Sequence, residues 1–252
     1  MDKLAVDIGN THIVLGLFRS EKLIHTWRIV SDASKTVDEY GLTIRSLLSS
    51  DQVKLSDSTK VVICCVVPPL ARVFTKLFQK HFSIEPKLIE SAKIKEIKIL
   101  CDNPSEVGAD RVVNAYAARE AYGAPGIVVD FGTATTFDVI SNDGHYQGGV
   151  IAPGLVAASE ALTNKAAMLP SIEIRDPVSV IGKNTLDSMM SGIVYGYASL
   201  VDGIVDRIVE ELGGEEIEIT STGGLARMMS EYSERIERVV PELTLEGLRK
   251  LS

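Results

Sequence analysis

One short pattern occurs twice in this chain, and it constrains the possible folds more than any other feature. Each copy is an apolar segment followed by Asp-x-Gly, with threonines close behind. The first copy contains Asp7 and Gly9, the second contains Asp130 and Gly132, and close to half of the 252 residues separates them. Two strand-turn motifs at this offset predict two similar halves that face one polyphosphate.

The residue types in the pattern suit a phosphate-binding turn. Glycine lets the backbone approach a ligand closely because it has no Cβ atom, and successive N–H groups in such a turn can point at phosphate oxygens. Nearby hydroxyl groups can add hydrogen bonds, and aspartate supplies oxygen ligands for the accompanying cation. The hydroxyls belong to Thr11, Thr133, Thr135 and Thr136. A single copy would more often be an ordinary turn, so the prediction depends on the repetition.

Composition and charge exclude several classes of function. With 45% hydrophobic and 24% charged residues, the chain is typical of a globular protein. Its net charge of −8 argues against nucleic acid or an anionic membrane as the main partner. The longest apolar run, residues 61–71, contains two prolines and is too short to span a bilayer.

The cysteines and the N-terminus indicate the compartment. No signal peptide is visible, and three cysteines cannot form a disulfide framework. We therefore expect a cytoplasmic protein in which Cys64 and Cys65 are small core residues. The four histidines are scattered, so the sequence predicts no His/Cys metal site.

Apolar periodicity predicts the elements of both halves. In the first half they are strands at 4–8, 13–18, 23–30 and 61–67, and helices at 37–48 and 69–81. In the second half they are helices at 104–122, 154–165, 186–212 and from 225, and strands at 126–130, 135–141, 145–151 and 217–220. Both halves contain three consecutive strands followed by helix and strand, which predicts an α/β fold with two domains, residues 1–117 and 118–252.

Three segments resemble the phosphate and nucleotide motifs of the superfamily that contains acetate and sugar kinases, heat-shock chaperone ATPases and actin. They are residues 7–11, 130–133 and 222–224, the last being Thr-Gly-Gly. The resemblance implies two ribonuclease-H-like domains, as in actin-like ATPases, with ATP in the cleft between them.

Further segments are similar to the signature of one family of this superfamily, the type III pantothenate kinases. They are residues 103–111, 130–136, 148–154, 182–185 and 243–248. The motifs run in order along the whole chain, and their combination is specific. The resemblance implies ATP-dependent phosphorylation of pantothenate to 4'-phosphopantothenate, the first step of coenzyme A synthesis.

The resemblance implies an ATP site around the first copy of the pattern. Its residues are Asp7, Ile8, Gly9, Asn10, Thr11, His12, Ile13 and Val14, with Thr133 from the second copy. Asp7 would face Mg²⁺ through water. Asp130 would bind a monovalent cation, K⁺ or NH₄⁺. Each aspartate could instead be a simple turn former at the end of a strand.

The resemblance places the general base at Asp110. An alcohol is a poor nucleophile until a positioned carboxylate accepts its proton. Positioning and charge neutralisation would supply most of the remaining catalysis. From spacing alone, a first-turn acid stabilised by the helix dipole is the simpler interpretation of Asp110.

Residues around Asp110, and one further threonine, are implied in binding pantothenate. They are Gly108, Ala109, Asp110 itself, Arg111 and Thr185. Arg111 suits the substrate carboxylate because arginine pairs with carboxylates in a bidentate manner. A surface ion pair for Arg111 and a helix N-cap for Thr185 are the simpler alternatives. The chain departs from the family at Cys101, where the family often has tyrosine in the substrate pocket.

Two other functions fit the same sequence. One is a regulatory relative that keeps the fold without catalysis, although Asp7, Asp110 and Asp130 argue against it. The other is a kinase for a different small alcohol or sugar. The family resemblance also implies a homodimer. Small residues in the helix at 186–212 permit close packing between two subunits, but they could equally pack within one chain.

Overall fold

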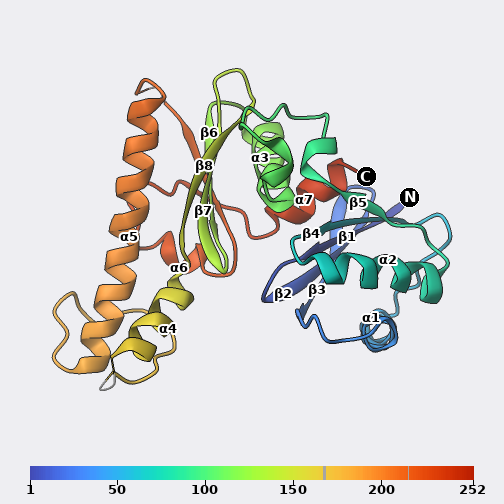
Figure 1. Cartoon of the computed structure of the whole chain (residues 1–252), viewed down its shortest axis with the longest axis horizontal. Helices are drawn as coiled ribbons and strands as arrows, with labels where there is room; N and C mark the ends of the chain where they lie inside the picture. The colour runs from blue at the N-terminus through green and yellow to red at the C-terminus, as the bar shows by residue number, and fades with distance from the viewer. Residues whose placement is uncertain (167–168, 215) are drawn as a thin grey trace. The chain divides into compact units, whose positions relative to one another are not determined.

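A computed structural model describes residues 1–166, 169–214 and 216–252 of the chain. The described chain forms two compact units (Figure 1). Unit 1 contains residues 1–98, 102–117 and 243–252, and unit 2 contains residues 99–101 and 118–242. The C-terminal segment therefore lies with the first half, although the sequence analysis grouped it with the second.

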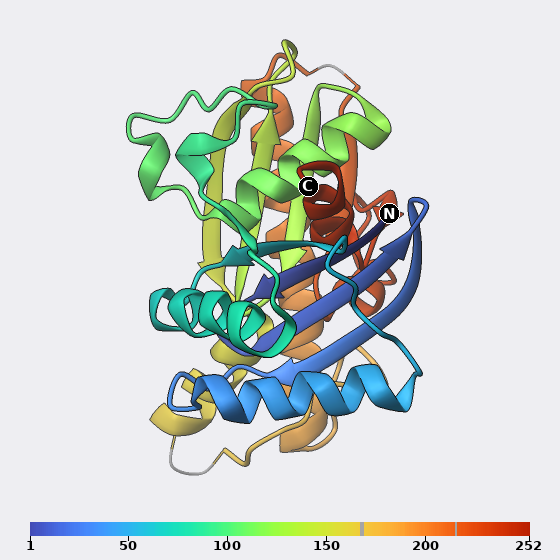
Figure 2. The same ribbon diagram turned by 90° about the vertical axis from the view of Figure 1, so that its right-hand side faces the viewer.

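Unit 1 is a five-stranded mixed sheet with helices on both faces (Figure 2). Its strands are β1 (Asp2–Ile8), β2 (His12–Arg19), β3 (Lys22–Val30), β4 (Lys60–Cys65) and β5 (Lys87–Ile89). Its helices are α1 (Val37–Ser50), α2 (Pro68–Phe82), the 3₁₀ helices η1 (Ser91–Lys93) and η2 (Pro104–Glu106), most of α3 (Ala109–Tyr122), and α7 (Leu243–Lys250). The strand order is β3-β2-β1-β4-β5, with β2 antiparallel to its neighbours and β1, β4 and β5 parallel.

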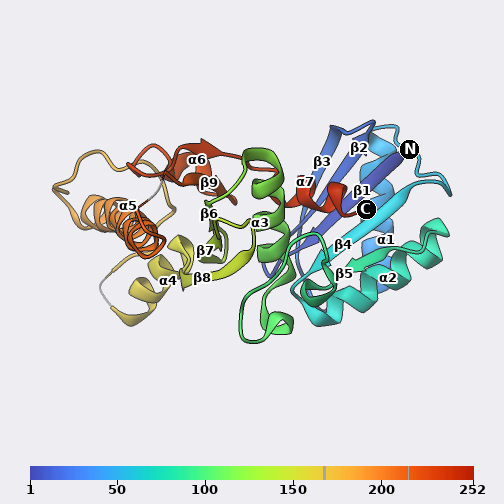
Figure 3. The same ribbon diagram turned by 90° about the horizontal axis from the view of Figure 1, so that it is seen from above.

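Different helices cover the two faces of this sheet (Figure 3). Side chains alternate along a strand, so Leu4, Val6 and Ile8 of β1 all point into one core, which they share with α1 and α2. The intervening residues of β1 point to the other face, where α7 packs. A Cβ atom on Gly16 of β2 would lie 2.8 Å from Leu245 of α7.

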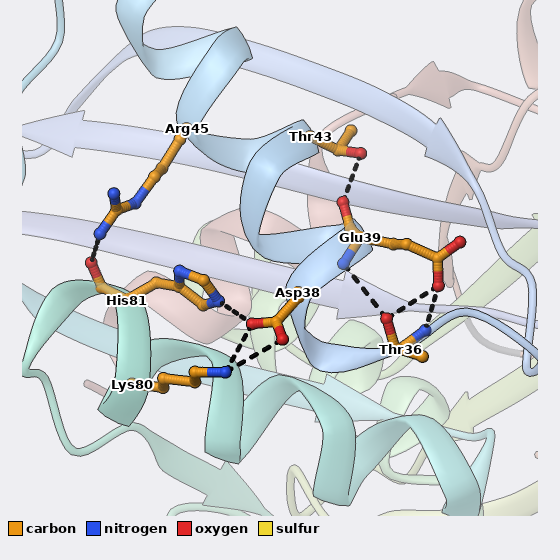
Figure 4. A network of polar contacts seen from close by, with 7 residues as sticks. All are labelled: Thr36, Asp38, Glu39, Thr43, Arg45, Lys80 and His81. Atoms are coloured by element: carbon orange, nitrogen blue, oxygen red, sulfur yellow. Dashed lines mark hydrogen bonds and ion pairs between the residues drawn. The ribbon is translucent and has the colours of Figure 1, made fainter.

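Local polar contacts define the start of α1 and join it to α2 (Figure 4). Thr36 and Glu39 form a capping box, in which the Glu39 carboxylate accepts from Thr36 N at 2.8 Å and the Thr36 hydroxyl accepts from Glu39 N at 3.3 Å. Asp38 accepts from Lys80 Nζ at 2.7 Å and lies 2.9 Å from His81 Nε2. These contacts set the two helices side by side over the core.

Unit 2 contains a second five-stranded sheet with the same arrangement of strands. The strands are β6 (Gly126–Phe131), β7 (Ala134–Ile140), β8 (Tyr146–Pro153), β9 (Glu218–Thr222) and β10 (Arg238–Val239). The helices are the end of α3, α4 (Leu155–Lys165), α5 (Thr185–Glu211) and α6 (Ala226–Met229). The order β8-β7-β6-β9-β10 repeats that of unit 1, including the parallel pairing of β6 with β9 and β9 with β10. The predicted α/β fold class and the duplication are confirmed.

Some predicted elements differ from those observed. The helix expected from 104 begins as the short η2, and α3 starts only at Ala109, because Val107 has an extended backbone. The helix expected from 225 has only four residues, α6. Strands β5 and β10 and helix α7 were not predicted. No helix among the described residues is long and apolar enough to cross a membrane.

Helix α7 packs closely against α3 within unit 1. A Cβ atom on Gly247 would lie 2.6 Å from Val113 Cγ1 and 2.7 Å from the Val113 carbonyl oxygen, so glycine permits the approach. Thr244 Oγ1 donates a hydrogen bond to Oδ1 of the buried Asn114 at 2.7 Å. The C-terminal helix therefore holds the helix on which Asp110 lies.

Candidate active site

The first Asp-x-Gly turn lies at the carboxyl end of β1 in unit 1. Gly9 N donates to His12 O at 3.0 Å, which closes the turn at the start of β2. Ser31 N donates to Thr11 O at 3.0 Å, which ties the turn to the end of β3. Asn10, Thr11 and His12 are exposed, so their polar groups can reach a ligand.

Strand register decides which of the other predicted ATP-binding side chains can reach a ligand. Ile8 and Ile13 are fully buried in the core beneath α1 and α2, so only their backbone atoms can take part. Asp7 points to the opposite face, directly opposite Val14 of β2 and Cys64 of β4. Asp7 and Val14 are both half-buried.

Asp110 lies in the first turn of α3, also in unit 1. Its Oδ1 accepts from Arg111 N at 2.8 Å, and a Cβ atom on Gly108 would lie 2.5 Å from the same oxygen. Burial raises the pKa of the Asp110 carboxyl, and the hydrogen bond and charge of Arg111 only partly offset this. Ala109 is buried, whereas Gly108 and Arg111 are half-buried. A carboxylate with a raised pKa is suited to accept a proton near neutral pH.

The Cys64 thiol lies close enough to both Asp7 and Asp110 to be affected by their charges. Burial raises the pKa of the Cys64 thiol well above its usual value, and the negative charges of Asp7 and Asp110 raise it further. Unit 1 thus brings two carboxylates that are far apart in the sequence into one environment. A thiol kept protonated is a poor nucleophile, so Cys64 does not act as one. Cys64 is buried, as predicted for a core residue, whereas Cys65 is only half-buried.

Asn103 shapes the loop that precedes Asp110. Asn103 Oδ1 accepts from Ser105 N at 3.3 Å and from Ser105 Oγ at 2.7 Å. Asn103 Nδ2 donates to Glu106 Oε1 at 2.7 Å. Sequence analysis placed Asn103 inside a motif without this role, although asparagine before proline is a signal for the start of a helical turn.

The departure at Cys101 lies in a segment of unit 2 that runs along β8. Leu100 N donates to Tyr146 O at 2.9 Å. Cys101 is half-buried, and its Sγ lies 3.9 Å from the position of a Cβ atom on Gly148, which is ordinary van der Waals distance. A small thiol therefore stands where an aromatic ring would extend further.

The second Asp-x-Gly turn lies at the end of β6 in unit 2. Gly132 N donates to Ala134 O at 3.1 Å, the counterpart of the bond that closes the first turn. Asp130 lies directly opposite Thr136 of β7 and Thr222 of β9. Opposed residues on neighbouring strands share a face, so hydroxyl-bearing side chains flank this carboxylate on both sides.

Adjacent threonines of β7 have different surroundings. Thr136 shares the face of Asp130, and its hydroxyl donates to Asp138 Oδ2 at 3.2 Å. Thr135 points to the opposite face and is fully buried, with no hydrogen-bond partner for its hydroxyl among the described residues. Thr133 is exposed in the turn. Of the hydroxyls that the sequence analysis grouped here, Thr135 is the one directed away from Asp130.

Gly223, in the Thr-Gly-Gly segment, packs against the Asp130 carboxylate. Its φ is +92°, a conformation that favours glycine. A Cβ atom there would lie 2.4 Å from Asp130 Oδ1 and 2.7 Å from the Phe131 carbonyl oxygen. The sequence indicated a nucleotide motif at this position but gave no sign of its contact with the second turn.

Thr185 occupies the first turn of α5 in unit 2. Asn184 is the N-cap, because its Oδ1 accepts from Asp187 N at 2.9 Å, so the interpretation of Thr185 as the N-cap is wrong. Thr185 is exposed and lines an apolar groove of about 610 Å³ beside α4 and α5. Other lining residues are Leu162, Met189, Gly192, Gly196 and Leu200.

The side chains around the two turns show which of them could bind a cation. Within residues 1–166, 169–214 and 216–252, no three His, Cys, Asp or Glu side chains gather as a metal-ligand cluster. A cation here would depend on a single carboxylate together with hydroxyl, backbone or ligand oxygens. Asp130 fits this description, with Thr136 and Thr222 on either side. Asp7 fits a cation that arrives with phosphates, because apolar Val14 and Cys64 flank it.

Comparison with known proteins identifies close relatives. A family model described as "Type III pantothenate kinase" matches residues 3–207. Type III pantothenate kinases of Syntrophobacter fumaroxidans and Moorella thermoacetica are 49% and 48% identical to this chain; the matches cover 98% of it and 95% and 96% of the relatives.

Solved structures with low sequence identity share the fold. The ethanolamine utilization protein EutJ of Carboxydothermus hydrogenoformans has a TM-score of 0.58 at 18% identity, covering 98% of this chain and 89% of that one. The activator of 2-hydroxyisocaproyl-CoA dehydratase from Clostridium difficile, with bound ADPNP, has a TM-score of 0.54 at 16% identity, covering 98% and 91%. These likenesses support the actin-like ATPase fold.

The close packing of Gly223 predicts a stability effect. Gly223→Ala should lower the free energy of unfolding by about 1–3 kcal/mol, because alanine is strained at this φ and its methyl group overlaps Asp130. Thermal unfolding measures the change. Gly224→Ala is the control, since nothing lies within 4 Å of a Cβ atom there. Equal melting temperatures for the two variants would contradict the contact.

Proposed function

We infer that this chain, which belongs to the type III pantothenate kinase family, phosphorylates pantothenate with ATP in coenzyme A synthesis. The match of the family model to residues 3–207, together with nearly half-identical relatives over 98% of the chain, carries this conclusion. The site geometry supports it, because unit 1 places the carboxylates of Asp7 and Asp110 in one environment.

Asp110 is the proposed general base. Its carboxylate accepts the proton of the pantothenate hydroxyl while that oxygen bonds to the γ-phosphorus of ATP and ADP leaves. The raised pKa brings the base closer to the operating pH. Gly108, Ala109 and Arg111 bind the substrate beside it, and the Arg111 guanidinium pairs with the pantothenate carboxylate.

The first turn is the proposed site for the phosphates of ATP. The exposed Asn10, Thr11 and His12 and the backbone of the turn donate to phosphate oxygens. Asp7 faces the accompanying Mg²⁺, which neutralises phosphate charge when bound. Thr133 of the second turn also binds ATP.

Asp130 is the proposed ligand of a monovalent cation, K⁺ or NH₄⁺. The hydroxyl-bearing Thr136 and Thr222 beside it favour this role, since oxygen donors suit such a cation. Asp7 of the first turn differs, because its neighbours Val14 and Cys64 offer no hydroxyl oxygen to a cation.

A homodimer is the proposed assembly, with the groove beside α4 and α5 as its interface. Small residues at Gly192 and Gly196 permit close approach of a second helix. Other apolar side chains in α4, at the start of α5 and in the segment before α5 are exposed. They are Leu162, Val178, Val180, Ile181 and Leu186. Thr185, which lines this groove, is the proposed pantothenate contact of unit 2.

A coupled ADP-release assay, with and without pantothenate, tests the function and the base. Asp110→Asn should lower kcat/KM by about 10²–10⁴-fold. In the wild type the rate should fall as pH falls through the raised pKa of Asp110, because the base acts only when ionised. Asp57→Asn, in an exposed loop, is the control. ADP release without pantothenate, or with another alcohol only, would refute the assignment.

The Asp110→Asn variant should have a higher free energy of unfolding at neutral pH than the wild type. A carboxyl whose pKa is raised in the folded state binds protons more tightly there than in the unfolded chain, so its ionisation destabilises the protein as pH rises. Asp110→Asn removes this ionisation and should raise the melting temperature at neutral pH but not near pH 3. A lower melting temperature at neutral pH would contradict the burial of the charge.

The cation site predicts activity in K⁺ that collapses in Na⁺ alone. Thr136→Val should raise the K⁺ concentration needed for half-maximal activity by about 10-fold or more, because it removes a hydroxyl beside Asp130. Thr135→Val is the matched control, since Thr135 lies on the opposite face of the same strand. Equal K⁺ requirements in both variants would count against the site.

The proposed interface predicts that a substitution in the groove halves the molar mass of the protein in solution. Gly196→Arg should convert the dimer to a monomer in light scattering, because the new side chain fills the groove while open space around Gly196 lets the chain fold. Glu210→Arg, an exposed position near the end of α5, is the control. A Gly196→Arg dimer as stable as the control would exclude this interface.

A further inference from the structure

Strand register in unit 1 places an arginine in the same row as Asp7. Asp7 of β1 pairs with Val14 of β2, and Val14 pairs with Arg28 of β3. Residues directly opposite one another in antiparallel strands point to the same face, so all three side chains share it. Strands lie about 4.8 Å apart, which puts the Cα atoms of Asp7 and Arg28 roughly 10 Å apart.

This end of the face is open. Helix α7 covers the neighbouring row, where Leu245 packs on Gly16, but Val14 is only half-buried and Arg28 is exposed. Val30, on the same face of β3, is 63% exposed. The Arg28 side chain makes no hydrogen bond or ion pair with any residue in the described part of the chain. Its guanidinium is therefore available to a ligand at the first turn.

The first turn lacks a cationic side chain of its own. Residues 7–14 contain Asp7 but no lysine or arginine, and Asp110 adds a second carboxylate to the same environment. A triphosphate keeps negative charge even with Mg²⁺ bound, and phosphoryl transfer depends on neutralising that charge. Arg111 follows Asp110 in the chain, whereas Arg28 lies opposite Val14 and can supply positive charge on that side of the first turn.

We propose that Arg28 is a further ATP-binding residue whose guanidinium donates hydrogen bonds to the terminal phosphate oxygens beside Asp7. The side chain reaches the phosphates over Val14, which is small and apolar and does not compete for them. The planar guanidinium suits bidentate contact with a phosphate. This inference deepens the proposed function and rests on its assignment of ATP to the first turn.

Arg28→Gln tests the proposal against Arg19→Gln. Arg19 lies at the far end of β2 from the turn, and its exposed ion pair with Asp2 contributes little to stability, so the control removes the same charge from the same sheet. Binding of Mg·ATP and of adenosine to the full chain is measured by titration calorimetry. KM values for ATP and pantothenate are measured in parallel.

Arg28→Gln should weaken Mg·ATP binding and raise the KM for ATP by about 10- to 100-fold, the range of a charge-assisted hydrogen bond. Adenosine affinity and the KM for pantothenate should stay within about two-fold of the control, because neither depends on the phosphates. Values for Mg·ATP equal to those of Arg19→Gln would overturn the proposal. A parallel loss of adenosine binding would also overturn it, since that indicates a structural effect.

Arg28→Lys keeps the charge and also tests the proposal if the glutamine variant fails to fold. Arg28→Lys should recover part of the Mg·ATP affinity that Arg28→Gln loses. A Mg·ATP affinity equal to that of Arg28→Gln would overturn the electrostatic role. The calorimetric arm needs no phosphorylation of pantothenate. A wild-type chain that binds Mg·ATP but leaves pantothenate unchanged would refute only the proposed function. If the wild type phosphorylates pantothenate and the Arg28 variants bind Mg·ATP as tightly as the wild type, only this inference is refuted.

Discussion

The pairing of β1 with β2 on one side and β4 on the other is the interaction on which unit 1 depends. This register sends Leu4, Val6 and Ile8 into the core and Asp7 to the opposite face. A slip of one residue would exchange the two faces, burying a carboxylate and exposing the apolar set. The burial of β1 therefore determines where the carboxylate of the first turn points, and with it the row that ends at Arg28.

The position of Asp110, the proposed general base, depends on a second long-range contact, between α7 and α3. The close approach at Gly247 and the hydrogen bond from Thr244 to Asn114 hold α3 through residues near the C-terminus. Asn114 is one helical turn beyond Asp110, so this contact orients the start of the helix. Residues 243–252 thus complete unit 1, although Thr244 is 130 residues along the chain from the Asn114 side chain that it contacts.

Local signals predicted much of the fold. Most strands and helices lie within a few residues of their predicted bounds, because apolar alternation and helical spacing reflect burial directly. The misses were β5, β10 and α7, which are too short for their period to stand out, and the start of α3, where Val107 is extended. Alternation within β7 could have separated Thr135 from Thr136, since neighbouring residues of a strand face opposite ways.

The sequence by itself determined the two Asp-x-Gly turns and their threonines, because a turn is set by its own few residues. Only the tertiary structure decided which residues from distant segments lie beside each carboxylate: Cys64 beside Asp7 and Thr222 beside Asp130. It also decided that Gly223 lies against Asp130. The physical reason is that β4 and β9 join the central strands only after long intervening segments. Their register is set by packing of the whole sheet, which no local pattern reports.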